Sequence, residues 1–148
     1  MKMKFLTPLA LVTTVILAAP ISVKAANPTD VQKLKQGSTS CVGCNLSGAN
    51  LKGAHLMGVD LRNANLQGAN LENANLEGAD LTGANLKSAK MTEAFVNSAS
   101  LNDANLTNAD LRRANLNSTE LKGAILAGAK LNGADIANAQ IKGNKGQW

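Results

Sequence analysis

The sequence predicts an all-β solenoid, a narrow rod in which regularly spaced aliphatic side chains line the axis. Every fifth position from Leu46 to Ile141 holds a large aliphatic residue or Met, in twenty positions without an exception. Two positions before each of these stands a small residue, which is Ala in seventeen of the twenty repeats. Asn, Asp and Gly, which favour turns, fill many of the remaining positions.

The five-residue period fits neither an α-helix nor a flat strand. Five residues advance about 500° on a helix, so successive Leu side chains would spread around its surface. On a strand, an odd step turns each Leu to the opposite face. A chain that turns a corner once per repeat keeps each Leu and the preceding Ala on one inner face. Gly two positions after the Leu tolerates positive φ, and Asn or Asp before it hydrogen-bonds the local backbone.

The first 25 residues have the features of a secretory signal peptide. Lys2 and Lys4 precede an apolar stretch, and the small residues Val23 and Ala25 favour cleavage after Ala25. An uncleaved membrane anchor is the alternative, but the apolar stretch is short for a membrane span. We therefore expect residues 1–25 to direct export, with no integral membrane span after cleavage.

The charge of the exported chain gives no basis for a nucleic-acid partner. Residues 1–25 carry three of the 15 basic residues and no acid, which leaves 12 basic and 10 acidic residues, a net charge of +2. Aromatic residues that stack on bases are also scarce, because this part contains Phe95, Trp148 and no Tyr. A nucleic-acid-binding surface of the basic type is therefore not expected.

Residues 26–40 are expected to form a short helix that caps the first coil. Asn27 suits the N-cap, Pro28 the first turn and Gly37 the C-terminal stop. Val31 and Leu34, three residues apart, present one apolar face to the coil. An exposed end of a solenoid requires such a cap. The repeats are assigned to residues 41–143 and a C-terminal tail to residues 144–148, where Trp148 either covers the last coil or extends freely.

Read as Ala-Asn/Asp-Leu followed by two variable residues, the motif resembles that of the pentapeptide-repeat family. Clear examples are Ala64-Asn65-Leu66, Ala69-Asn70-Leu71 and Ala79-Asp80-Leu81. The resemblance implies a right-handed quadrilateral parallel β-helix, with four repeats per coil and about five coils. With the signal peptide, it is similar to the exported cyanobacterial members, which implies the thylakoid lumen or the periplasm. A monomer is favoured, although the oligomeric state is left open.

Cys41 and Cys44 form the one motif that suggests catalysis. Cys41 has the phase of the Leu positions and Cys44 that of the Ala positions, so both are expected to point inward. Three alternatives remain: a structural disulfide, two buried thiols, or a redox pair, which would need exposure at a helix N-terminus. A bond between residues this close closes a very small loop and gains little entropy. Zinc is not expected, because no second Cys or His pair completes four ligands.

The outward positions carry the remaining information. With four repeats per coil, residues twenty apart stack, which places Lys52 beside Glu72 and Glu93 beside Arg113. A line of acidic residues is expected to be neutralised by cations two positions away. The acids are Asp60, Asp80 and Glu120, and the cations are Arg62, Lys122 and Lys142.

The stretch from Lys87 to Ser100 departs most from the motif. Lys90 and Phe95 stand where Asn or Asp is usual, and Phe95 is expected to point outward between Asn75 and Asn115. An aromatic side chain exposed on a polar wall is a candidate contact for a partner. Lys90 and Phe95 are therefore the candidate partner-contact residues, against the simpler interpretation of a tolerated irregular repeat.

These observations predict a non-enzymatic structural or protein-interaction module, with no catalytic, cofactor or metal site. There is no Ser/His/Asp set, no phosphate-binding loop and no His-Glu-x-x-His motif, and His55 is expected on the surface. Two alternatives are kept. The resemblance offers a DNA mimic that binds type II topoisomerases, which calls for a strongly acidic rod. Cys41 and Cys44 offer a redox protein.

Overall fold

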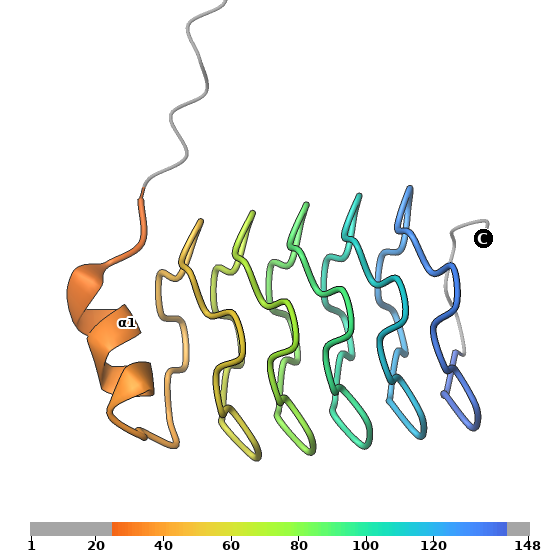
Figure 1. The fold of residues 1–148 in the computed structure, drawn as a ribbon, viewed down its shortest axis with the longest axis horizontal. Coiled ribbons are helices and arrows are strands. Elements are labelled where there is room, and N and C mark those ends of the chain that lie inside the picture. Colours follow the sequence, from red (N-terminus) through yellow and green to blue (C-terminus); the bar gives the residue numbers. More distant parts are fainter. Residues whose placement is uncertain (1–24, 142–148) are drawn as a thin grey trace, which may run out of the picture.

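The structure is a computed structural model that describes residues 25–141. It contains a row of similar coils with one helix, α1, at one end (Figure 1). The expected signal peptide, except for Ala25, and the expected tail at 144–148 lie outside the described residues, as does Trp148.

Parallel bridges between residues twenty apart set the register of the coils. Seventeen isolated bridges have this spacing, from Ser40↔Asp60 to Glu120↔Gln140. Twenty residues are four repeats of five, so four repeats complete one coil. The links are regular: Leu66 N donates to Asn85 O at 2.8 Å, and Asn85 N donates back to Ala64 O at 2.9 Å.

The bridging residues form four columns, and each column marks one wall of the rod. The Asp60 wall contains Ser40, Asp60, Asp80, Ser100, Glu120 and Gln140. The Asn65 wall contains Asn45, Asn65, Asn85, Asn105 and Ile125. The Lys90 wall contains Asn50, Asn70, Lys90, Asp110 and Lys130. The Phe95 wall contains His55, Asn75, Phe95, Asn115 and Asp135.

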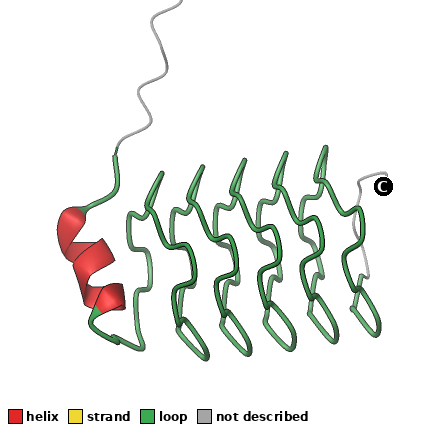
Figure 2. Cartoon of the chain, viewed as in Figure 1, coloured by secondary structure: helices red, strands yellow, loops and turns green. Residues whose placement is uncertain are grey.

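Each wall contains fewer extended residues than the short strands that the sequence predicts. No continuous strand occurs in residues 25–141, and each wall is a ladder of single bridging residues (Figure 2). A turn follows every aliphatic residue, as where Ala69 N donates to Leu66 O at 3.0 Å. The turn bends the chain, so one bridging residue per wall is left, although Gly68 N in the turn still donates to Lys87 O of the next coil at 2.9 Å.

The third residue of every turn has positive φ, as type II turns require. Ten of these twenty residues are Gly, such as Gly78 with φ 63°. The other ten include Glu93 and Arg113, with φ of 59° and 58°, where an L side chain is unfavourable. Asn or Asp at the bridging position supports the turn, because its side chain accepts the N–H two residues later. Asn65 Oδ1, for example, accepts from Gln67 N at 3.2 Å.

The aliphatic and Ala positions fill the interior of the coils. Leu66 and Leu106 are 0% exposed, and the Ala residues between the walls are buried with them. The burial weakens toward the end that contains residues 126–141. Leu126 is 7% exposed, Leu131 is half-buried and Ile136 is 46% exposed.

Helix α1 spans Pro28–Lys35 and lies against the first coil (Figure 1). Asn27 is the N-cap and accepts a hydrogen bond from Thr29 N at 3.0 Å, while Gly37 follows the helix with φ 86°. The helix thus lies between the expected N-cap and stop residues and is shorter than the segment 26–40 that the sequence assigns to it. Leu34 is 3% exposed and belongs to the same core as the coils, with Val31 packed against it.

Candidate interaction surface and the cysteine pair

Phe95 lies on a wall whose other bridging residues are polar or charged. It bridges Asn75 on one side and Asn115 on the other, and 49% of its surface is exposed. The backbone is held in the regular register, since Phe95 N donates to Ala74 O at 2.9 Å and Leu76 N donates to Phe95 O at 2.7 Å. The ring is therefore presented to solvent by a rigid wall, which suits a contact point.

Lys90 lies on the adjoining wall, one corner away from Phe95. It is exposed and stacks between Asn70 and Asp110. The corner between the two walls contains a shallow hollow of about 300 Å³. We call this the Arg112 corner, and it is lined by Thr92, Arg112, Arg113 and Asn132. Lys90 and Phe95 thus flank a corner that presents guanidinium, hydroxyl and amide groups.

Both arginines of the Arg112 corner are already paired with carboxylates. Arg112 Nε and Nη2 donate to Asp110 Oδ1 and Oδ2 at 2.8 and 2.7 Å. These hydrogen bonds lower the pKa of the Asp110 carboxyl and raise that of the Arg112 guanidinium. Arg113 pairs with Glu93 of the neighbouring coil, as the twenty-residue spacing predicts. Among the described residues Lys90 makes no ion pair, so it keeps its charge available for a partner.

The Asp60 wall, on the opposite side of the rod from Lys90, is neutralised in part. The Arg62 guanidinium donates two hydrogen bonds to Asp60, at 2.9 and 2.7 Å, and its Nε lies 3.6 Å from an oxygen of Asp80. The Arg62 hydrogen bonds lower the pKa of Asp60.

Among the described residues, no ion pair joins Lys122 to Glu120. Asn102 Nδ2 donates to Glu120 Oε2 at 2.7 Å, and Lys122 N donates to Asn102 Oδ1 at 2.9 Å. The side-chain amide of Asn102 therefore bonds both the Glu120 carboxylate and the Lys122 backbone. Lys142, the third expected cation, lies outside the described residues.

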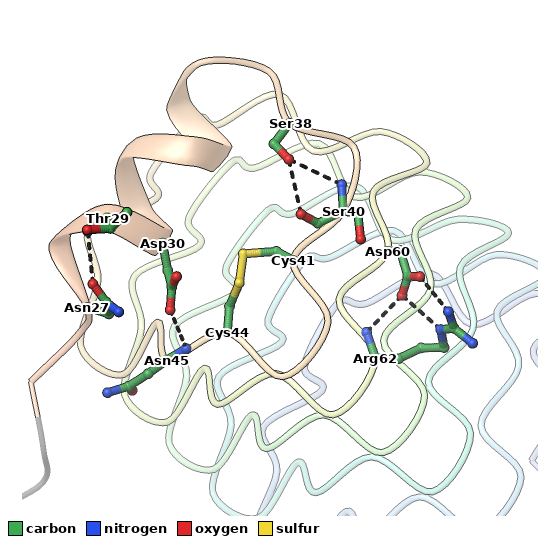
Figure 3. Close-up of a disulfide and its surroundings, with 10 residues drawn as sticks. All are labelled: Asn27, Thr29, Asp30, Ser38, Ser40, Cys41, Cys44, Asn45, Asp60 and Arg62. Carbon is green, nitrogen blue, oxygen red and sulfur yellow. Dashed lines mark hydrogen bonds and ion pairs between the residues drawn. A yellow bond between two sulfur atoms is a disulfide. The ribbon is translucent and has the colours of Figure 1, made fainter.

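Cys41 and Cys44 are joined by a disulfide at the start of the first coil (Figure 3). Their Cα atoms are 5.2 Å apart, Cys41 is 2% exposed and Cys44 is half-buried. Cys44 N also donates to Cys41 O at 3.2 Å, so the bond spans a turn of the regular repeat. This position, against the core and near α1, differs from an exposed pair at a helix N-terminus.

Residues 25–141 show neither a candidate metal cluster nor a candidate membrane-spanning helix. No group of three or more His, Cys, Asp or Glu side chains is placed to hold a metal ion. No helix there has the length and apolar character that crossing a membrane requires. His55 is exposed on the Phe95 wall, with no cluster of ligating residues around it in this part of the chain.

Sequence reasoning missed the polar contacts that join α1, and the residue before it, to the first coil. Asp30 Oδ2 accepts from Asn45 N at 3.0 Å, and Asn27 N donates to Asn45 O at 2.8 Å. The sequence places Asp30 in the first turn of the helix. The repeat pattern does not predict which wall of the first coil this side chain faces. Thr119 was also missed as a buried polar residue. Its hydroxyl donates to Val96 O at 2.9 Å in the core.

Comparison with known proteins agrees with this architecture. The family model described as "Pentapeptide repeats" matches four overlapping stretches, at residues 39–78, 60–97, 79–117 and 99–138. The chain therefore belongs to the pentapeptide-repeat family, whose fold is a right-handed β-helical solenoid. No curated protein matches the sequence.

Two solved structures of cyanobacterial pentapeptide-repeat proteins are similar over most of their length. Rfr23 from Cyanothece 51142 is 32% identical, with 78% of this chain and 95% of that chain covered and a TM-score of 0.60. Alr5209 from Nostoc Pcc 7120 is 31% identical, with 80% and 97% covered and a TM-score of 0.64. These similarities support the fold of the repeats and leave the function to be argued from the surface.

Proposed function

We propose that this protein is a non-enzymatic, exported interaction module that binds a protein partner through Phe95, Lys90 and the Arg112 corner between them. The observation that carries the proposal is the exposure of Phe95 on a polar wall, next to an unpaired lysine. Aromatic side chains contribute most when a partner buries them, and surrounding polar groups set the orientation. The rigid coil keeps these groups in place before binding, so little ordering entropy opposes association.

The proposed architecture extends that of the family. We propose about five coils, with α1 as a cap that shields the first coil and the Cys41–Cys44 disulfide as a structural bond. Burial of Leu34 under α1 supports the cap, and burial of Cys41 supports the structural role of the bond. We further propose that residues 1–25 are a cleaved export signal and that the protein acts in the thylakoid lumen or the periplasm, as a monomer.

The contact surface is tested by site-specific photo-crosslinking in the native host. A photoreactive amino acid replaces Phe95 in one variant and Ile125 in the other. Ile125 is the matched control, because it is a bridging residue with 50% exposure on the Asn65 wall. We expect one discrete crosslinked protein from position 95 and none from position 125. Equal crosslinking from both positions would show that no specific contact exists at Phe95.

The two alternatives have less support from the surface. A DNA mimic needs a continuous acidic wall, whereas Arg62 is bonded to Asp60 on the one acidic line. A redox role needs accessible sulfur, and Cys41 is 2% exposed. Mass spectrometry of the native protein with a thiol-blocking label, with and without mild reductant, tests the redox role. Rapid reduction and labelling under native conditions would support it.

A further inference from the structure

The first coil has no coil before it, so its bridging residues face the edge of the solenoid. In every later coil, the backbone N–H and C=O of the bridging residue bond to the preceding coil. The corresponding groups of the first coil belong to Ser40, Asn45, Asn50 and His55, one on each wall. Unpaired edge groups of this kind are a template for strand addition.

The segment before the first coil provides partners on two of the four walls (Figure 3). Ser38 Oγ donates to Ser40 O at 3.0 Å and accepts from Ser40 N at 3.4 Å. For Asn45, the Asp30 carboxylate accepts the N–H and Asn27 N donates to the C=O. On these walls the edge is closed by side chains and by the residue that precedes α1.

The other two walls are open. Within residues 25–141, the backbone N–H and C=O of Asn50 and of His55 make no hydrogen bond. One coil later the same positions are used, since Asn70 N donates to Ala49 O and Asn75 N to Ala54 O, both at 2.9 Å. The groups at Asn50 and His55 therefore have the geometry of a bonded ladder and lack a partner.

A groove of about 560 Å³ lies beside this open edge. Its apolar floor is shared by the helix and the first coil: Leu34, Leu51 and Leu56 are at most 3% exposed there, and Ala54 is half-buried. This volume is within the range of about 300–1,000 Å³ typical of ligand sites. Open backbone groups beside an apolar groove suit a bound peptide, whose backbone pairs with these groups while a side chain enters the groove.

The rim of the groove is cationic. Lys35, Lys52 and His55 line it, and Lys35 makes no ion pair with any described residue. Lys52 pairs with Glu72 of the following coil at 3.0 Å. A carboxylate in an added strand would stack on the other side of Lys52, in the same way that Glu72 does. The charge of the rim therefore favours an acidic peptide.

We propose that the edge formed by Asn50 and His55 binds an acidic segment of a partner protein as one added repeat, which turns the corner between the two walls and pairs in parallel with both residues. One aliphatic side chain of that segment enters the groove, and its carboxylates lie beside Lys35 and Lys52. This site is separate from the contact surface proposed above, which consists of Phe95, Lys90 and the Arg112 corner. Each proposal is therefore tested without the other.

The probe is the peptide acetyl-Ala-Asp-Leu-Glu-Gly-Ala-Asp-Leu-amide, which repeats the pattern of the coils and carries three acidic residues. Isothermal titration calorimetry of this peptide into the purified protein measures affinity. Hydrogen exchange measured by NMR reports the amides of Asn50 and His55. We expect saturable binding, with both amides exchanging rapidly in the free protein and slowly in the complex.

Two comparisons separate strand addition from nonspecific adhesion. Methylation of the two Leu amide nitrogens of the peptide removes donors that strand pairing uses, and should weaken binding at least about fivefold. Lys35→Glu should also weaken binding about fivefold, whereas Lys33→Glu should leave it unchanged. Lys33 is the matched control because it also lies in the last turn of α1 and is exposed, but does not line the groove.

Four results would overturn the proposal. One is absence of peptide binding, and another is binding that N-methylation does not weaken. A third is slow exchange at Asn50 and His55 in the dilute free protein, which would mean that another part of the chain covers the edge. The fourth is protection that rises with protein concentration alone, which would identify a second copy of the chain as the occupant.

Discussion

The two ends of the rod differ in how the last layer of the core is covered. At the N-terminal end α1 packs Leu34 onto the first coil, where Leu46, Leu51 and Leu56 are at most 1% exposed. At the other end Ile136 is 46% exposed, although it has the same position in the repeat. The comparison teaches that an aliphatic side chain of the repeat is fully buried only where another layer covers its coil on each side. A coil in the middle has both layers from its neighbours, and an end requires another element.

The largest effect is expected from an acidic residue in the middle of the core. Leu106→Asp places a carboxylate where the side chain is 0% exposed, and should cost at least about 5 kcal/mol and unfold the rod. Leu131→Asp, at the half-buried equivalent near the C-terminal end, should cost about 1–2 kcal/mol. Urea denaturation followed by circular dichroism measures both. Equal losses would break the comparison between the middle and the end.

A smaller loss is expected at the N-terminal end when the helix loses its anchor. Leu34→Ala removes a side chain that is 3% exposed and should destabilise the protein by about 2–4 kcal/mol. The half-buried Val31, changed to Ala, should cost about 1 kcal/mol and serves as the control. Hydrogen exchange should rise first at Asn45, whose N–H is bonded to Asp30. Uniform acceleration along the whole rod would contradict a local cap.

The disulfide is expected to contribute less than Leu34. The double substitution Cys41→Ser and Cys44→Ser should lower the free energy of unfolding by about 1–2 kcal/mol, because the bond closes a loop with a sequence separation of 3. The measurement is the urea midpoint of the variant against the oxidised parent. A larger loss than that of Leu34→Ala would mean that the bond, and not the helix, holds this end together.

The smallest effect concerns a charge pair on the wall. Arg112 lowers the pKa of Asp110 in the folded state, so the pair stabilises the protein above the unfolded pKa of about 3.9. That contribution is lost as the pH falls through the folded pKa. Asp110→Asn keeps an oxygen that can accept the Arg112 N–H, and should reduce the stability lost between pH 6 and pH 3. Urea midpoints of the parent and of Asp110→Asn at the two pH values measure this loss of stability. An equal loss in both proteins would show that the pair does not contribute to it.

The sequence was sufficient for the repeat and its burial, because the buried positions recur without exception from Leu46 to Leu126. It also predicted the helix, whose cap residues Asn27 and Gly37 act through local backbone geometry. The four repeats per coil came from the family resemblance, because period five does not fix the number of corners. The bridges between residues twenty apart supply that number directly.

The surface was harder to predict than the core. The stacked pairs Lys52–Glu72 and Arg113–Glu93 followed from the spacing alone, because stacking needs only the length of a coil. The hydrogen bonds of Asn102 to the Glu120 carboxylate and to the Lys122 backbone did not follow, because they depend on side-chain rotamers. The open edge at Asn50 and His55 depends on the path of the chain before the repeats. That path is set by α1 and Ser38, to which the five-residue pattern does not extend.

The twenty-residue register also restricts how this chain changes in length. Insertion of four repeats adds one coil and returns every later residue to its own wall. Insertion of a single repeat after Asn70 would preserve the core but rotate all later residues by a quarter turn. Phe95 and Asn75 would then leave the column of His55 together, and their position relative to the groove beside α1 would change by one wall. Duplication of whole repeats therefore preserves the pattern of core residues. It moves the later outward residues to other walls, unless the number of added repeats is a multiple of four.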